Sequence, residues 1–188
     1  MKADIKAHIP NFLTLLRLAL LPVLVGLLLM DQAWSVWLGL GVYVVAALSD
    51  WLDGFLARRY QVVSDFGTFL DPIADKIFVV VILVLLVGLG RLPDLWVIVP
   101  ILILAREFLV SGLREFLAPL HVRVPVSHLA KWKTGLQMLA TGFLVIAPYA
   151  PWAWVWSVGQ WGLALAAGLT LLTGWGYIRA SLAHIGVR

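Results

Sequence analysis

Four aspartates at helical spacing are the residues best suited to chemistry in this sequence. Asp50 and Asp53 lie three residues apart in "SDWLDGFLARRY", and Asp71 and Asp75 lie four apart in "GTFLDPIAD". On a helix, either spacing places both side chains on one face. Long apolar runs flank both pairs, where an insertion scale gives each carboxylate a cost of about 2.5–3.5 kcal/mol. Left together without a counter-charge, the acids would repel one another or take up protons.

Divalent cations are the natural counter-charge for these acids. Clustered carboxylate oxygens suit hard ions such as Mg²⁺ or Mn²⁺, and two ions would balance four carboxylates. The chain has no cysteine, which excludes a disulfide, a thiolate metal site and a cysteine nucleophile. The predicted metal ligands are Asp50, Asp53, Asp71 and Asp75. Two other interpretations are acids hydrated at a loop and acids lining an ion or proton path.

Small and basic residues accompany the acids. Gly54 and Ala57 follow on the side of Asp50 and Asp53, and Gly67 precedes Asp71 by four residues. Small residues let a ligand reach the backbone or let helices approach closely. Arg58 comes within reach of any anion that the metals hold. Together these residues predict a pocket for a metal-bound phosphate or diphosphate.

A second set of basic residues exceeds what one metal-bound diphosphate requires. Its members are Arg17, Arg106, Arg114, Lys131 and Lys133. They suggest a second anionic substrate, although long basic side chains also snorkel toward lipid phosphates. Arg106 and Glu107 are adjacent, so on a helix they point about 100° apart and need not pair.

The elements that carry these residues read as membrane helices. Of the 188 residues, 62% are hydrophobic and 13% are charged, whereas soluble domains are about one quarter charged. Apolar stretches of about 18 residues or more predict membrane spans. We expect one all-α integral-membrane domain over residues 1–188, with no cleaved signal peptide. Its six predicted spans are 11–30, 34–57, 67–89, 94–118, 126–148 and 152–180.

The distribution of charge predicts the orientation of the spans. Basic residues gather at both termini and in the second and fourth linkers, whereas the opposite side carries only Arg91. By the positive-inside rule, both termini and the acid pairs face the cytoplasm, in the cell membrane. The net charge of +4 is therefore a topology signal, and we expect no nucleic-acid partner.

The spacing of the acids resembles a known signature. Residues 50–75 fit D-x2-D-G-x2-A-R-x8-G-x3-D-x3-D at all eight fixed positions. This pattern resembles that of the CDP-alcohol phosphatidyltransferases. The stretches "IPNFLTLLRLALLP", "LDPIADK", "AREFLVSGLREFLA" and "AKWKTGLQM" also resemble the bacterial members that make phosphatidylglycerol phosphate. The resemblance covers most of the chain.

The resemblance implies a reaction and a role for each motif residue. A CDP-linked lipid binds with its diphosphate on the metals, an acceptor hydroxyl attacks the lipid-side phosphorus, and CMP leaves. Asp75 is then the general base, and Gly54, Ala57, Arg58 and Gly67 line the CDP site. The implied substrates are CDP-diacylglycerol and glycerol 3-phosphate, the latter held by the second basic set. The family is typically homodimeric.

Three alternatives stay open. The same chemistry could use inositol phosphate, phosphatidylglycerol or serine as acceptor, although the basic cluster favours a phosphorylated one. An intramembrane prenyltransferase also uses acidic pairs, but on well-separated motifs. A cation transporter predicts acids near mid-bilayer and a repeat between the halves. The acids here lie near one predicted membrane face, and the C-terminal half has no counterpart motif.

Overall fold

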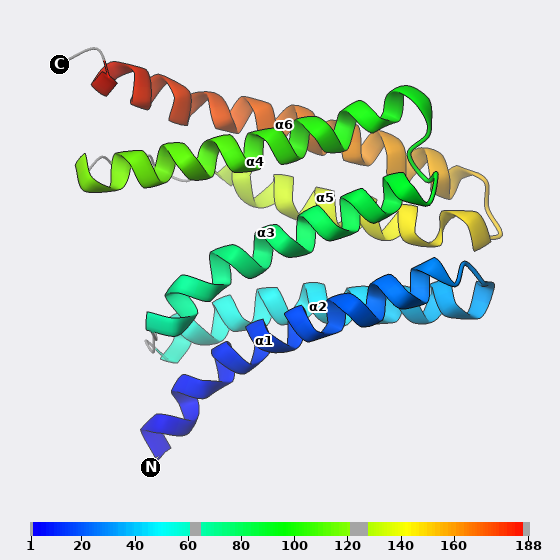
Figure 1. Cartoon of the computed structure of the whole chain (residues 1–188), viewed down its shortest axis with the longest axis horizontal. Helices are drawn as coiled ribbons and strands as arrows, with labels where there is room; N and C mark the ends of the chain where they lie inside the picture. The colour runs from blue at the N-terminus through cyan, green and yellow to red at the C-terminus, as the bar shows by residue number, and fades with distance from the viewer. Residues whose placement is uncertain (1, 61–64, 121–127, 186–188) are drawn as a thin grey trace. The chain divides into compact units, whose positions relative to one another are not determined.

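The chain folds as a series of long helices (Figure 1). The computed structural model describes residues 2–60, 65–120 and 128–185, and these ranges contain no strand. The α-helices are α1 (Lys2–Leu29), α2 (Ala33–Tyr60), α3 (Asp65–Gly88), α4 (Ile98–Leu117), α5 (His128–Ile146) and α6 (Trp154–Ile185). Short 3₁₀ turns are η1 (Asp94–Val97), η2 (Ala118–Leu120) and η3 (Ala147–Tyr149). The all-α prediction is confirmed, and most predicted boundaries agree within a few residues, except that α1 begins well before residue 11.

The apolar composition explains both the helices and their surface. In hydrocarbon, backbone N–H and C=O groups must be paired within the protein, and a helix pairs them along one segment. Segments long and apolar enough to cross a bilayer are Asn11–Leu29, Ala33–Asp50, Asp94–Leu117 and Trp154–Arg179. Large apolar side chains such as Phe12, Phe108 and Leu172 are exposed on the surface, as lipid-facing residues are. The chain is therefore a membrane protein, while six spans and cytoplasmic termini stay predictions.

The helices form two compact units, and each is treated by itself. Unit 1 comprises Met1–Arg91 and Val145–Pro151. In it, α1 and α2 run side by side as a hairpin, with Asp31 in the connecting turn at φ 46° (Figure 1). Asp tolerates this left-handed conformation better than most residues. A Cβ added at Gly39 of α2 would lie 2.9 Å from Leu28 Cδ2, so the glycine permits the close approach of α1 and α2.

The C-terminal end of α3 also follows from its sequence. Gly90 has φ 68°, Gly90 N–H donates to the Val87 carbonyl at 3.0 Å, and Arg91 N–H donates to the Leu86 carbonyl at 2.9 Å. This pair of bonds is the Schellman ending, which favours glycine at the left-handed position. It brings Arg91 back onto unit 1, where this side chain is buried.

Unit 2 comprises Leu92–Leu144 and Trp152–Arg188. In it, α4 packs along α6. A Cβ added at Gly159 of α6 would lie 2.8 Å from Leu144 Cγ, and one at Gly162 would lie 3.1 Å from Ala140 Cβ. Small residues thus let α6 approach α5 closely, as is common between membrane helices.

Candidate active site

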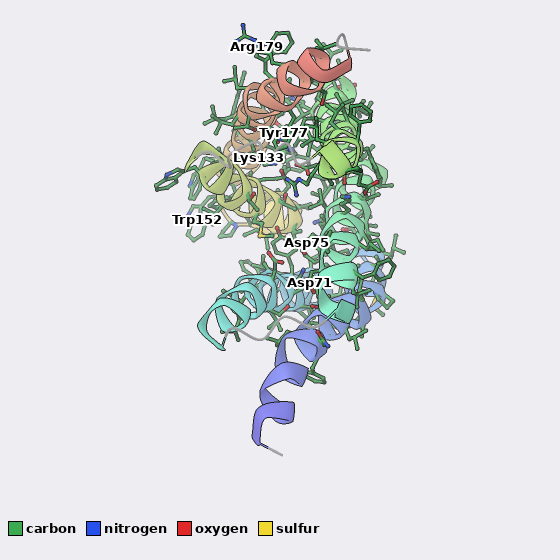
Figure 2. The ribbon with its side chains drawn as sticks, turned by 90° about the vertical axis from the view of Figure 1, so that its left-hand side faces the viewer. Asp71, Asp75, Lys133, Trp152, Tyr177 and Arg179 are labelled. Atoms are coloured by element: carbon green, nitrogen blue, oxygen red, sulfur yellow. The ribbon has the colours of Figure 1, made fainter. Side chains whose placement is uncertain are left out.

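Within unit 1, α1 presents two polar side chains to the acids of α3. Thr14 and Arg17 lie three residues apart on α1, and both are buried. Thr14 Oγ1 donates a hydrogen bond to Asp71 Oδ1 at 2.6 Å, and Arg17 Nη1 donates to Asp75 Oδ1. Asp71 and Asp75 lie one turn apart on α3 (Figure 2). The matched helical spacings therefore pair a face of α1 with the acidic face of α3.

Arg17 also joins α2 to this site. Its Nη1 lies 2.8 Å from Asp50 Oδ1, so one nitrogen contacts carboxylates from two helices. The side chain of Arg17 is only 2% exposed, whereas those of Asp50 and Asp75 are 30% and 52% exposed. Because Arg17 itself is buried, removing its carboxylate partners is costly, since its charge is left uncompensated. Arg17 thus fixes where Asp50 and Asp75 converge while leaving both accessible.

The acids fit a hard divalent cation. Asp50 and Asp75 already place one oxygen each against a single cationic nitrogen, and Asp71 lies one turn from Asp75. An all-oxygen donor set is what Mg²⁺ and Mn²⁺ favour. Among the described side chains, no three His, Asp or Glu residues already stand at metal-binding distances.

Several predicted site residues lie outside the described side chains. Asp53, Gly54, Ala57 and Arg58 occupy the last turns of α2, where only the helical backbone is described. Near the start of α5, only the helical backbone of Lys131 is described. Gly67 is described and lies buried in α3.

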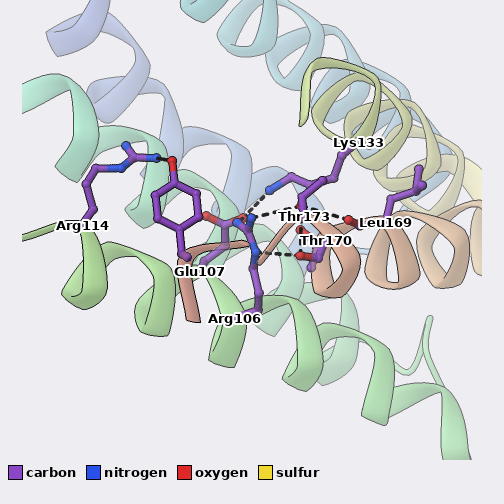
Figure 3. Close-up of polar contacts among 8 residues, drawn as sticks. Arg106, Glu107, Arg114, Lys133, Leu169, Thr170 and Thr173 are labelled. Atoms are coloured by element: carbon purple, nitrogen blue, oxygen red, sulfur yellow. Dashed lines mark hydrogen bonds and ion pairs between the residues drawn. The ribbon is translucent and has the colours of Figure 1, made fainter. Parts of the chain in front are cut away.

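Unit 2 holds a cluster of opposite charge, in which one carboxylate joins two cations (Figure 3). Glu107 Oε1 lies 3.0 Å from Arg106 Nη1 and 2.6 Å from Lys133 Nζ. The side chains of Arg106 and Lys133 are only 10% and 9% exposed. Arg106 and Glu107, which need not pair on sequence grounds, do pair. Because Lys133 lies on α5, its contact with Glu107 connects α4 to α5.

The other donors of Arg106 bind α6. Arg106 Nε donates to the Thr170 carbonyl at 2.8 Å, and Nη2 donates to Thr173 Oγ1 at 3.1 Å (Figure 3). With the bond to Glu107, every nitrogen of the guanidinium has a protein partner. Because guanidinium groups are planar, these bonds fix the plane of the side chain.

Arg114 lies two turns along α4 from Arg106 and is exposed. Its Cζ lies 5.6 Å from the Tyr177 ring centroid, and Nη2 lies 3.4 Å from the Tyr177 hydroxyl. An aromatic face attracts a cation at this distance. Glu107 thus contacts both Arg106 and Lys133. The side chain of Arg114, further along α4, contacts Tyr177 of α6 instead. The sequence pattern groups Arg17 with these basic residues, whereas the structure places it among the acids of unit 1.

Sequence reasoning did not assign Thr14, Glu107, Thr173 or Tyr177 to the site. Glu107 carried a signal, because an acid inside an apolar segment is costly unless it is paired. Thr14, Thr173 and Tyr177 carried none, since threonine and tyrosine are unremarkable in membrane helices.

The chain is similar in sequence to known proteins over most of its length. The family model of CDP-alcohol phosphatidyltransferases matches residues 7–172. The CDP-diacylglycerol–glycerol-3-phosphate 3-phosphatidyltransferase of Rickettsia bellii (strain RML369-C) is 44% identical over 181 residues, covering 96% of this chain and 97% of that protein. The protein of the same name from Pseudomonas fluorescens is 42% identical, covering 95% of this chain and 92% of its own.

A plant protein is also similar. The CDP-diacylglycerol–glycerol-3-phosphate 3-phosphatidyltransferase 1, chloroplastic/mitochondrial, of Arabidopsis thaliana is 37% identical over 87% of this chain and 59% of its own length. These matches confirm the resemblance that the acidic signature indicated. The chain belongs to the CDP-alcohol phosphatidyltransferase family.

Proposed function

We propose that this protein transfers the phosphatidyl group of CDP-diacylglycerol to glycerol 3-phosphate, giving phosphatidylglycerol phosphate and CMP. The names of relatives that align along nearly the whole chain support this reaction. The observation that carries the proposal is the convergence of Asp50, Asp71 and Asp75 on Thr14 and Arg17. It brings acids from both halves of the family signature to the same polar residues of α1.

The reaction requires one bond to form and one to break. A hydroxyl oxygen of glycerol 3-phosphate bonds to the lipid-side phosphorus, and the bond from that phosphorus to the bridging oxygen breaks. The bridging oxygen leaves with CMP and takes the electron pair. We assign Asp75 the hydroxyl proton, because its side chain is half exposed and its position is fixed by Arg17. A positioned base of this kind contributes about 10²–10⁴-fold in rate.

The donor lipid is assigned to the acid cluster. Asp50, Asp53, Asp71 and Asp75 would hold one or two Mg²⁺ or Mn²⁺ ions. When bound, the ions would neutralise the diphosphate and the charge that develops on the leaving group. Gly54, Ala57, Arg58 and Gly67 are assigned to the CDP moiety, since small residues admit the nucleotide and Arg58 can pair with its phosphates.

The acceptor phosphate is assigned to basic residues. Arg106, Arg114, Lys131 and Lys133 would bind it through charge-assisted hydrogen bonds, the strongest class in proteins. Arg17 is kept in this assignment because it lies beside Asp75, the proposed base. We further propose that six spans place both substrate sites at the cytoplasmic face of the cell membrane, and that the protein is a homodimer.

The test is CMP release by purified protein in lipid nanodiscs. We expect release from CDP-diacylglycerol that requires both glycerol 3-phosphate and Mg²⁺ or Mn²⁺, and that stops when a chelator removes the metal. Replacing glycerol 3-phosphate by inositol phosphate, serine or phosphatidylglycerol should give little product. No CMP release with any acceptor and metal would contradict the transferase function. Release with a different preferred acceptor would contradict only the choice of glycerol 3-phosphate.

A further inference from the structure

One face of α6 forms a cradle for Arg106, made by the Thr170 carbonyl, the Thr173 hydroxyl and the bare backbone at Gly174. The carbonyl and the hydroxyl accept bonds from Nε and Nη2 of the guanidinium, at 2.8 and 3.1 Å. The single hydrogen of the Thr173 hydroxyl is donated within its own helix, where the carbonyls of Leu169 at 2.9 Å and Thr170 at 3.1 Å share it. The acceptor for Nη2 is therefore itself held in place.

Gly174 makes the space in which Arg106 lies. A Cβ at this position would stand 3.1 Å from Arg106 Nε and 3.3 Å from its Cγ, closer than side-chain packing normally allows. It would also stand 3.5 Å from Val110 Cγ2, one turn further along α4. A methyl group on this face would therefore require Arg106 to shift by a few tenths of an ångström relative to the two oxygens that hold it.

Two other glycines of α6 show that the close approach of Arg106 is confined to Gly174. A Cβ added at Gly168 or at Gly176 would meet nothing within 4 Å. The three glycines share a helix, and only Gly174 of the three has the arginine against it. They therefore provide a matched set of Gly-to-Ala changes with the same chemistry and different neighbours.

We propose that Thr173 and Gly174 are positioning residues for the acceptor, which they influence through Arg106. The cradle and Glu107 together hold the guanidinium in a single orientation before the acceptor arrives. An arginine that is already ordered loses little side-chain entropy when it binds a phosphate, so binding is tighter. The inference rests on the proposed acceptor role of Arg106. Neither Thr173 nor Gly174 is assigned a contact with substrate.

The first experiment compares Gly174→Ala with Gly168→Ala and Gly176→Ala in the nanodisc assay. We expect Gly174→Ala to raise the KM for glycerol 3-phosphate about 10-fold, the size of one lost hydrogen bond to a charged group. Its kcat and its KM for CDP-diacylglycerol should stay within about 2-fold of the parent, within the scatter of context-dependent effects. The two control variants should leave all three constants unchanged.

The second experiment removes one hydroxyl and covers the case in which Gly174→Ala does not fold. Thr173→Val should raise the acceptor KM about 10-fold, because Arg106 loses one bond. The matched control is Thr141→Val, since buried Thr141 donates to the Gln137 carbonyl of its own helix α5 at 2.7 Å. A general loss of packing would act on both threonine variants and on every kinetic constant.

Direct binding separates this inference from the function on which it rests. Calorimetric titration of glycerol 3-phosphate into each variant should show weaker binding for Thr173→Val and for Arg106→Ala. If Arg106→Ala weakens binding and neither cradle variant does, the cradle inference is overturned and the proposed function stands. If Arg106→Ala, Thr173→Val and Gly174→Ala all bind glycerol 3-phosphate like the parent protein, both the cradle inference and the proposed acceptor role of Arg106 are overturned. Equal effects on kcat and on both KM values would also overturn the inference.

Discussion

The acid cluster of unit 1 and the basic cluster of unit 2 are built alike with the charges reversed. In unit 1 one buried cation, Arg17, contacts Asp50 and Asp75. In unit 2 one carboxylate, Glu107, contacts Arg106 and Lys133. In each cluster the single opposite charge joins different helices and holds like charges close together. The majority charge is left in excess, and we infer that it sets the sign of the ligand.

The two clusters differ in how their majority charges are exposed. Asp50 and Asp75 are 30% and 52% exposed, whereas Arg106 and Lys133 are at most 10% exposed. Accessible acids suit ligands that arrive and leave, such as metal ions and a nucleotide. Nearly buried cations suit an anion that is recognised by fixed donors, because hydrogen bonds strengthen as water is excluded.

The largest effect is expected in the acid cluster. Asp75→Asn keeps the size of the side chain and removes its ability to take a proton. The rate of CMP release should fall by about 10²–10⁴-fold, the contribution of a positioned general base. Binding of CDP-diacylglycerol, measured by titration, should be largely retained. Near-normal turnover would remove Asp75 from the role of base.

The next largest effect is expected in the basic cluster and should fall on the other substrate. Arg106→Ala should raise the KM for glycerol 3-phosphate by about 10–100-fold, the range for lost hydrogen bonds to a charged group. The KM for CDP-diacylglycerol should change little. Arg179→Ala, which removes an exposed arginine of α6, is the matched control. An unchanged acceptor KM in Arg106→Ala would contradict the proposed acceptor site.

A smaller effect is expected at the carboxylate that joins the two cations. Glu107→Gln keeps a hydrogen-bond acceptor and removes the charge, so Arg106 and Lys133 are held less firmly. The acceptor KM should rise by about 3–10-fold, and Glu107→Asp should restore part of the loss because it keeps the charge. Glu115→Gln, at an exposed position of α4, is the control. A fall in the acceptor KM would mean that Glu107 competes with the substrate.

The smallest effect on activity is expected at Arg91, a second fully buried arginine among the described side chains of unit 1. Arg91 donates to the Val145 carbonyl, and its Nη2 lies 3.3 Å from Asp31 Oδ1. Burial lowers the pKa of Arg91 from its ordinary value, and Asp31 opposes that shift. Arg91→Met should lower the Tm of the purified protein and leave both KM values unchanged. A selective change in one KM would show that Arg91, which has no contact with the acid cluster in the described contacts, nevertheless acts on a substrate.

Much of the fold and part of the site could be predicted from sequence, for local reasons. Apolar runs of helical length predicted the helices. The i, i+3 and i, i+4 spacings gave the shared faces of the acids. The pairing of Thr14 with Asp71, and of Arg106 with Thr173 and Gly174, depends on how each helix is rotated against its neighbour. That rotation is a property of packing and has no signature in one helix alone.

The most direct test measures two quantities on two variants, the metal concentration that gives half-maximal rate and the KM for glycerol 3-phosphate. Asp71→Asn, in the acid cluster, should raise the required metal concentration and leave the acceptor KM unchanged. Arg106→Ala, in the basic cluster, should raise the acceptor KM and leave the metal requirement unchanged. If each variant shifted both quantities equally, or the two effects were exchanged, the division of labour between the clusters would be contradicted.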